Sequence, residues 1–303
     1  MIGATWRFWR LHDHAEELAR HASRLLVTSD RMPPHQRALA LSGAGFTFMA
    51  GGDHGRARSM FESSLPLYRH TEDKLGTALT TAALGHIMAL QHEDARATTL
   101  LEHTLAELQG TGADQLAAPE RLQYLLALAL AANFLGQIQL SRGDHDRAAG
   151  MFTDGLNAAR RAQEHFTILV SLYDLALSSH QQGDLSRAAS LLEEGVSVAV
   201  KAGDRSAVAY YLEALGPVAS DQGHPERAVG LLSAAAALLQ ASGSGWLHAY
   251  VPRAPHGDEV LAALRTRVGD AAFEQARASS RSPDGQPALD HAMEQAHRAA
   301  LPA

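Results

Sequence analysis

Gly143-Asp144-His145-Asp146-Arg147-Ala148-Ala149-Gly150-Met151-Phe152 is the stretch that decides the fold, because the chain contains it in five forms. The Gly-x-x-x-Arg-Ala pattern returns at 183–192 and 223–232, and it occurs earlier at Gly52 and, in altered form, at His92. The copies thus keep a constant spacing of 40, interrupted once by a spacing of 51 before Gly143. A fixed period of this size predicts an all-α solenoid in which each unit packs against its neighbours.

Each unit is predicted to be a helix, a Gly-Asp break and a second helix. Glycine at the break can adopt the left-handed conformation that ends a helix, and Asp144 or Asp184 can cap the next helix. Ala148 and Phe152 lie four positions apart, on one face of the second helix. A small residue seven positions before each break lets a neighbouring helix approach closely, and these residues are Gly45, Gly85, Gly136, Ala176 and Gly216.

These units resemble tetratricopeptide repeats, whose pattern has Leu-Gly in the first helix and Ala then Phe in the second. The resemblance implies a right-handed α-solenoid of about five helix pairs, with a period of 40 in place of the usual value of about 34. We expect an N-terminal helical cap or degenerate repeat at 1–33, a superhelix at 34–242 and a C-terminal helical cap at 243–303.

Two local features depart from the regular repeat. Eleven extra residues between the second and third units, around 110–119, predict a longer surface linker. Pro217 lies inside the first helix of the fifth unit, where it removes a hydrogen bond and predicts a kink.

The two ends of the chain carry a second, narrower resemblance. Trp6-Arg7-Phe8-Trp9, together with the Val-Gly-Asp-Ala-Ala-Phe-Glu-Gln-Ala stretch at 268–276, resembles the C-terminal repeat region of large actinobacterial transcriptional regulators. Those proteins join a signalling ATPase to a tetratricopeptide sensor and to a DNA-binding domain of the LuxR or antibiotic-regulator type. The resemblance implies either a sensor region of such a regulator or a small stand-alone relative. The partner would then be an ATPase or DNA-binding domain of the same regulator.

Composition excludes several classes of function. The chain has no cysteine, which excludes disulfides, thiolate metal sites and cysteine nucleophiles. A formal net charge of −7 argues against direct nucleic-acid binding. No apolar run reaches membrane-spanning length, and the N-terminus lacks the pattern of a signal peptide. We therefore expect a cytoplasmic location and no membrane partner.

Catalytic motifs are also absent from the sequence. It contains no G-x-x-x-x-G-K-[ST], no H-E-x-x-H and no G-x-S-x-G. His12, His14 and His21 form a candidate metal cluster, but many of the 17 histidines fall at repeat breaks, where they are ordinary polar residues. We expect a protein that is not an enzyme, with no catalytic residue, no metal and no cofactor.

The concave surface of the superhelix is the predicted binding site. Aromatic anchors interleaved with amides and histidine suit a peptide or a moderately polar ligand. Phe46 and Leu177 have the alternative role of packing between neighbouring helices. The family arrangement places the following residues on this side: Phe46, Met49, His86, Leu90, Asn133, Gln137, Tyr173, Leu177, His180, Tyr210 and Glu213.

Our first hypothesis is a non-enzymatic sensor or adaptor domain that binds a protein or peptide partner in its concave groove, in transcriptional regulation. The alternative is an effector-binding domain with a metabolite or antibiotic inside the superhelix, held by His86, Asn133, Tyr173 and Tyr210. A homodimer is a further alternative, because the apolar end faces of a solenoid favour self-association.

Overall fold

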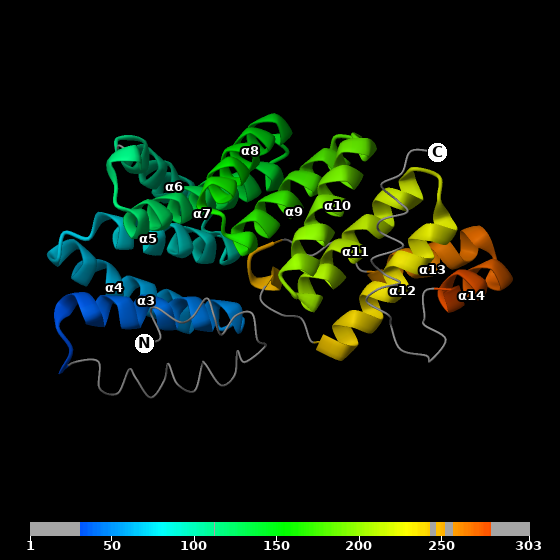
Figure 1. Ribbon diagram of the computed structural model, residues 1–303, viewed down its shortest axis with the longest axis horizontal. Coiled ribbons are helices and arrows are strands. Elements are labelled where there is room, and N and C mark those ends of the chain that lie inside the picture. The colour runs from blue at the N-terminus through cyan, green and yellow to red at the C-terminus, as the bar shows by residue number, and fades with distance from the viewer. Residues whose placement is uncertain (1–30, 112, 243–246, 252–256, 280–303) are drawn as a thin grey trace. The chain divides into compact units, whose positions relative to one another are not determined.

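The computed structural model describes residues 31–111, 113–242, 247–251 and 257–279. Within these ranges all regular structure is helical, with twelve α-helices and two short 3₁₀ turns. Ten of the α-helices form five consecutive pairs, so the predicted all-α solenoid is confirmed (Figure 1). The chain divides into two compact units at 167/168. The predicted N-terminal cap, with His12, His14 and His21, lies almost wholly outside the described residues.

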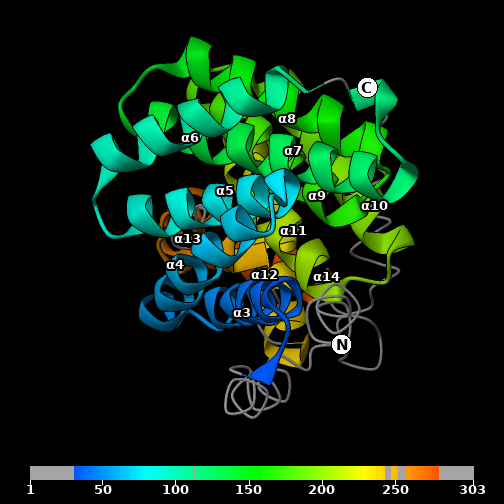
Figure 2. The ribbon, with the colours of Figure 1, turned by 90° about the vertical axis from the view of Figure 1, so that its left-hand side faces the viewer.

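The first unit contains three helix pairs, whose members we call A and B helices in chain order. Figure 2 shows the B helices on the outside of the row that the A helices form. The A helices pack against one another, α3 on α5 and α5 on α7. The elements of this unit are α3 (Pro34–Ala50), α4 (His54–His70), α5 (Lys74–Leu90), α6 (Asp94–Gln109), η2 (Ala113–Gln115), α7 (Ala118–Ser141) and α8 (His145–Ala162).

The second unit contains the last two helix pairs and a helical hairpin. The hairpin, α13 and α14, packs against α12, the last helix of the repeat array. The first turn of α9 precedes the division between the units. The elements are α9 (His165–Gln181), α10 (Leu185–Lys201), α11 (Arg205–Asp221), α12 (Pro225–Ser242), η3 (Leu247–Ala249), α13 (Gly257–Val268) and α14 (Asp270–Ser279).

The breaks inside the pairs have the predicted geometry. Gly143 and Gly183 are left-handed, each with φ of 79°. The side chains of Asp144 and Asp184 cap α8 and α10 by accepting hydrogen bonds from backbone N–H groups three positions on. In the altered second repeat, His92 replaces the glycine and still adopts the left-handed conformation, with φ of 63°. This copy therefore keeps its turn although its sequence diverges.

The breaks between pairs use the same geometry without a constant glycine. Glu72, Gln163 and Gly203 are left-handed, with φ of 54°, 53° and 70°. Left-handed residues therefore recur at a constant interval on either side of the insertion, at 52, 72 and 92 and again from 143 to 223. A 17-residue helix such as α5 or α10 plus a three-residue turn is the structural unit, and two of these make one sequence period.

The small residues of the A helices admit large side chains from the B helices, as predicted. A Cβ added to Gly45 would lie 2.5 Å from Cε1 of Phe61, and one added to Gly136 would lie 2.6 Å from Cε1 of Phe152. Gly85 and Gly216 have the same relation to Leu101 and Leu232 (2.8 and 2.6 Å). The partner occupies the same position of the following B helix each time, so this contact repeats with the sequence.

The two local departures from the repeat lie at the connection before α7 and inside α11. The extra length divides between the connection at 110–117, which contains η2, and α7, which begins at Ala118 and has 24 residues against 17 in α5. The predicted longer linker is therefore present, and α7 is lengthened as well. By length and composition α7 could cross a membrane, but 83% of its most apolar window is buried as a core helix of the repeat array. Pro217 lies inside α11, which continues through it to Asp221.

Candidate functional site

The A helices, which carry every predicted binding residue, are buried almost throughout their length. Every residue of α3 from 40 to 50 is buried, whereas α4 buries only one face. The physical reason is that an A helix packs on its own B helix and on the A helices beside it. Seven predicted binding residues are no more than 6% exposed, namely Phe46, Met49, His86, Asn133, Tyr173, Tyr210 and Glu213.

In the first unit, the predicted residues pack between helices. Phe46 meets Phe61 of its own repeat edge to face, with ring centroids 5.1 Å apart. His86 stacks on Phe134 at 4.1 Å and so joins α5 to α7. The side chain of Asn133 lies against Gly155 of α8, where an added Cβ would come within 2.2 Å of its Oδ1. Gln137 is half-buried, and Leu90 at the end of α5 is 43% exposed.

In the second unit, three predicted residues meet at one small pocket. Tyr173, Leu177 and His180 of α9 line it, with Pro217 of α11 opposite. The pocket has a volume of about 20 Å³, roughly that of one water molecule. Nε2 of His180 lies 2.7 Å from Oδ2 of Asp221, which joins the C-terminal ends of α9 and α11. Leu177 and His180 are half-buried and therefore partly accessible.

Tyr173 of this pocket belongs to a buried tyrosine pair. Tyr173 and Tyr211 meet edge to face with centroids 5.7 Å apart, and the hydroxyl of Tyr211 donates to the carbonyl of Leu169. Burial raises the pKa of Tyr211 well above its usual value, and the Asp174 carboxylate raises it further. Sequence reasoning did not identify Tyr211. The sequence feature that could have indicated it is Gly195, whose missing side chain leaves room for a large ring. In the structure an added Cβ there would lie 1.9 Å from Cε1 of Tyr211.

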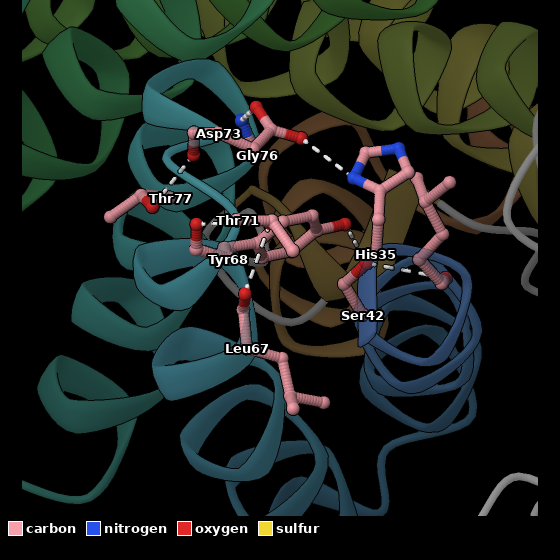
Figure 3. A network of polar contacts seen from close by, with 9 residues as sticks. His35, Ser42, Leu67, Tyr68, Thr71, Asp73, Gly76 and Thr77 are labelled. Carbon is pink, nitrogen blue, oxygen red and sulfur yellow. Dashed lines mark hydrogen bonds and ion pairs between the residues drawn. The ribbon is translucent and has the colours of Figure 1, made fainter. Parts of the chain in front are cut away.

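A polar network in the first unit was also not predicted (Figure 3). The hydroxyls of Ser42 and Tyr68 lie 2.8 Å apart, joining α3 to α4. Nδ1 of His35 lies 3.6 Å from Oδ2 of Asp73, whose Oδ1 accepts a hydrogen bond from the backbone N–H of Gly76. Burial raises the pKa of Tyr68 to about 12. The network ties α3, α4 and the first turn of α5 together.

This network contains serine, histidine and aspartate, but its geometry is structural. Ser42 donates to the carbonyl of Leu39 and pairs with Tyr68, while His35 pairs with Asp73. Across the network shown in Figure 3 no hydrogen bond joins Ser42 to His35, so the serine has no adjacent base to activate it. Across the ranges that the structure describes, no three His, Asp or Glu side chains gather into a metal site.

In the third and fifth repeats, the arginine of the repeated motif forms an ion pair with the preceding B helix. Nη2 of Arg147 lies 3.2 Å from Oε1 of Glu102, and Nη2 of Arg227 lies 3.6 Å from Oε1 of Glu193. The two carboxylates occupy equivalent positions in their repeats. In the first unit, Arg58 of α4 adds a pair with Glu93 at the start of α6. These pairs align neighbouring repeats, a role that the sequence period alone did not assign to the arginine.

The comparisons with known proteins identify the fold. No protein-family model matches the chain, and no curated protein resembles it significantly. BtubC (BKLC) from P. vanneervenii aligns over 80% of this chain and 95% of its own, with 17% identity and a TM-score of 0.58. RapI in its apo form aligns over 98% and 84%, with 11% identity and a TM-score of 0.51.

A kinesin light chain from Podosopora anserina with nearly identical TPR-like repeats aligns over 70% of this chain and 98% of its own. Its identity is 18% and its TM-score 0.47. At these identities the likeness to BtubC and RapI shows the fold alone, a helical-repeat solenoid.

Proposed function

We propose that this chain is a non-enzymatic repeat adaptor that binds an extended segment of a partner protein over the C-terminal halves of α9 and α11. The observation that carries the proposal is the convergence of Tyr173, Leu177 and His180 beside Pro217. Leu177 and Pro217 offer an apolar rim, on which a partner side chain can rest. The His180–Asp221 pair beside it supplies polar groups for the partner's backbone.

The size of this pocket favours a peptide over an enclosed metabolite. Pockets that enclose small molecules have volumes of about 300–1,000 Å³, whereas this one has about 20 Å³. A partner side chain pressed against the rim needs no cavity, because interface anchors gain their energy from contact area and exclusion of water. The small-molecule alternative is therefore not favoured at this pocket, which Tyr173 alone lines among the four residues that the sequence suggested for it.

The rest of the repeat array supports the adaptor role through rigidity. Close glycine contacts pack α11 against both neighbouring B helices before a partner arrives, through Gly195 with Tyr211 and Gly216 with Leu232. A preorganised surface loses less conformational entropy on binding and so binds more tightly. We propose that the remaining predicted residues, from Phe46 to Glu213, stabilise the packing of the A helices and do not contact the partner protein.

The regulatory setting of the proposal rests on the resemblance of the two chain ends. We place the adaptor in the cytoplasm, in transcriptional control, with an ATPase or DNA-binding domain of the same regulator as its partner. Occupancy of the α9–α11 surface would favour one conformation of the repeat array over another and so alter that contact.

Photo-crosslinking tests the proposed surface. A photoreactive amino acid is placed at Leu177, and in a matched control at the exposed Ser190 of α10, and crosslinked proteins are identified by mass spectrometry. We expect one partner to crosslink at 177 and not at 190. The affinity of the purified partner segment should fall about tenfold in Leu177→Glu, or about 1.4 kcal/mol, and stay unchanged in Ser190→Glu. Equal crosslinking at both positions, or an unchanged affinity in Leu177→Glu, would contradict the proposal.

A further inference from the structure

A larger pocket lies at the other end of the second unit, between α12 and the α13–α14 hairpin. Its volume is about 440 Å³, within the range of about 300–1,000 Å³ typical of small-molecule sites. None of the predicted binding residues lines it. The lining residues are Ser233, Ala236, Ala237 and Gln240 of α12, Leu261, Ala262 and Arg265 of α13, and Phe273 and Arg277 of α14.

The pocket exists because α12 presents small side chains toward the hairpin. Ser233, Ala236 and Ala237 leave a gap that a leucine at the same positions would fill. Leu261 and the buried ring of Phe273 form the facing wall. The interior is therefore mainly apolar and suits an aliphatic or aromatic body.

Arg265 lines this pocket and contacts three residues of the hairpin. Its guanidinium lies over the ring of Phe273, 5.2 Å from the centroid. Its Nε donates to Oδ1 of Asp270 at 2.6 Å, and its Nη2 lies 3.6 Å from Oε1 of Glu274. Neither carboxylate lines the pocket. Since guanidinium has five N–H donors in a planar fork, donors remain for a further carboxylate.

A second arginine lines the same pocket. Arg277 follows Phe273 by one helical turn on α14 and lines the pocket beside Arg265. Two arginines around an apolar interior select a ligand with an anionic head and an apolar body, because the head pairs with guanidinium while the body leaves water. We propose that this pocket binds small amphiphilic monocarboxylates, with the carboxylate on Arg265 and Arg277 and the chain against Phe273 and the alanines of α12.

The proposal goes beyond the adaptor function and does not depend on it. The α9–α11 surface and this pocket have no lining residue in common. A failed crosslinking result at Leu177 would leave the carboxylate site standing, and the reverse also holds. If both are correct, the cap carries an effector site on the same unit as the partner surface.

Isothermal titration of the full chain with octanoate tests the site, with octan-1-ol and octylamine as probes of the same chain length. We expect saturable binding of octanoate and at least about tenfold weaker binding of the other two, since a hydrogen bond to a charged carboxylate is stronger than one to a neutral hydroxyl and an ammonium is repelled by guanidinium. Octanol or octylamine binding as tightly as octanoate would overturn the proposal, and so would the absence of saturable octanoate binding.

Matched variants locate the binding in this pocket. Arg265→Gln and Arg277→Gln should each weaken octanoate binding about tenfold or more. Arg267→Gln is the control, because Arg267 lies on the same helix, contacts Ser220 and does not line the pocket. Ala236→Leu fills the pocket from an exposed position and should abolish binding without loss of thermal stability. Equal losses in Arg267→Gln and Arg265→Gln, or full binding in Ala236→Leu, would overturn the assignment.

Discussion

A large side chain packs on a glycine both within repeats and between repeats, but the two kinds of contact differ in how regularly they recur. Within a pair, the ring of Phe152 packs on Gly136, and the same contact recurs at equivalent positions of other repeats. Between pairs, Tyr68 packs on Gly76, whereas Tyr211 packs on Gly195. In the first of these the ring belongs to a B helix and in the second to an A helix. Packing within a pair therefore recurs at equivalent positions, whereas packing between pairs differs from one junction to the next.

The largest effect that sharpens this comparison is expected at Gly195. Gly195→Ala places a Cβ 1.9 Å from the buried Tyr211 ring, and we expect a loss of about 3 kcal/mol of unfolding free energy, because overpacking a core forces backbone shifts. Urea denaturation followed by circular dichroism measures it. Gly150→Ala is the control, since nothing lies within 4 Å of that position in α8, and it should stabilise by about 0.5–1 kcal/mol. Equal effects at both glycines would show that the junction is loosely packed.

The second effect is a dependence of stability on alkaline pH. Tyr68 titrates near 10.0 when unfolded and at about 12 when folded. Its contribution is therefore fully present below pH 10 and is lost as the pH rises through the folded value, up to about 2–3 kcal/mol. Urea denaturation of the wild type at pH 8, 10 and 11.5 should show this decline. Tyr68→Phe should decline less, and an identical slope in the variant would refute the assignment.

A smaller effect compares the caps at the two kinds of turn. Asp184 caps α10 inside a pair, and Asp73 caps α5 between pairs. Each change to alanine should cost about 1 kcal/mol. Asp73→Ala should cost more, because it also removes the contact with His35 shown in Figure 3. Melting temperatures measure both, with the exposed mid-helix Asp154→Ala as control. A smaller loss in Asp73→Ala than in Asp184→Ala would contradict the role given to the network.

The smallest effect concerns the ion pairs that the motif arginines form. Double-mutant cycles for Glu102 with Arg147 should give a coupling of about 0.5 kcal/mol or less, because both side chains are largely exposed. Glu193 with Arg227 should couple more strongly, since these side chains are 15% and 25% exposed. Repeating the cycles in 1 M salt should reduce the first coupling more than the second. A larger salt effect on the Glu193–Arg227 coupling than on the Glu102–Arg147 coupling would contradict the explanation that burial strengthens the second pair.

Much of the fold could be predicted because its signals are local. Left-handed Gly143, the cap at Asp144 and the face shared by Ala148 and Phe152 all follow from residues close together in the chain. Repetition then showed that these signals belong to one unit. The turns between pairs were harder, because Glu72 and Gln163 adopt left-handed conformations without a glycine to mark them.

The candidate site could be predicted only in part, since it depends on which helices meet. Leu177 and His180 lie together at the α9–α11 pocket, but Asn133 lies against Gly155 and His86 stacks on Phe134. A family projection assigns a residue to a side of the helix. It does not reveal that neighbouring A helices already cover that side.

The sequence by itself determined the helix pairs, their caps and the contact of small residues with the B helices, because these depend on short-range stereochemistry repeated with a period of 40. Only the tertiary structure decided the rest. Ser42 pairs with Tyr68 of the next helix, and Tyr211 donates to Leu169 across two helices. Arg265 meets Phe273 only because α13 and α14 pack against each other as a hairpin. Such contacts depend on how whole helices pack, which no local pattern encodes.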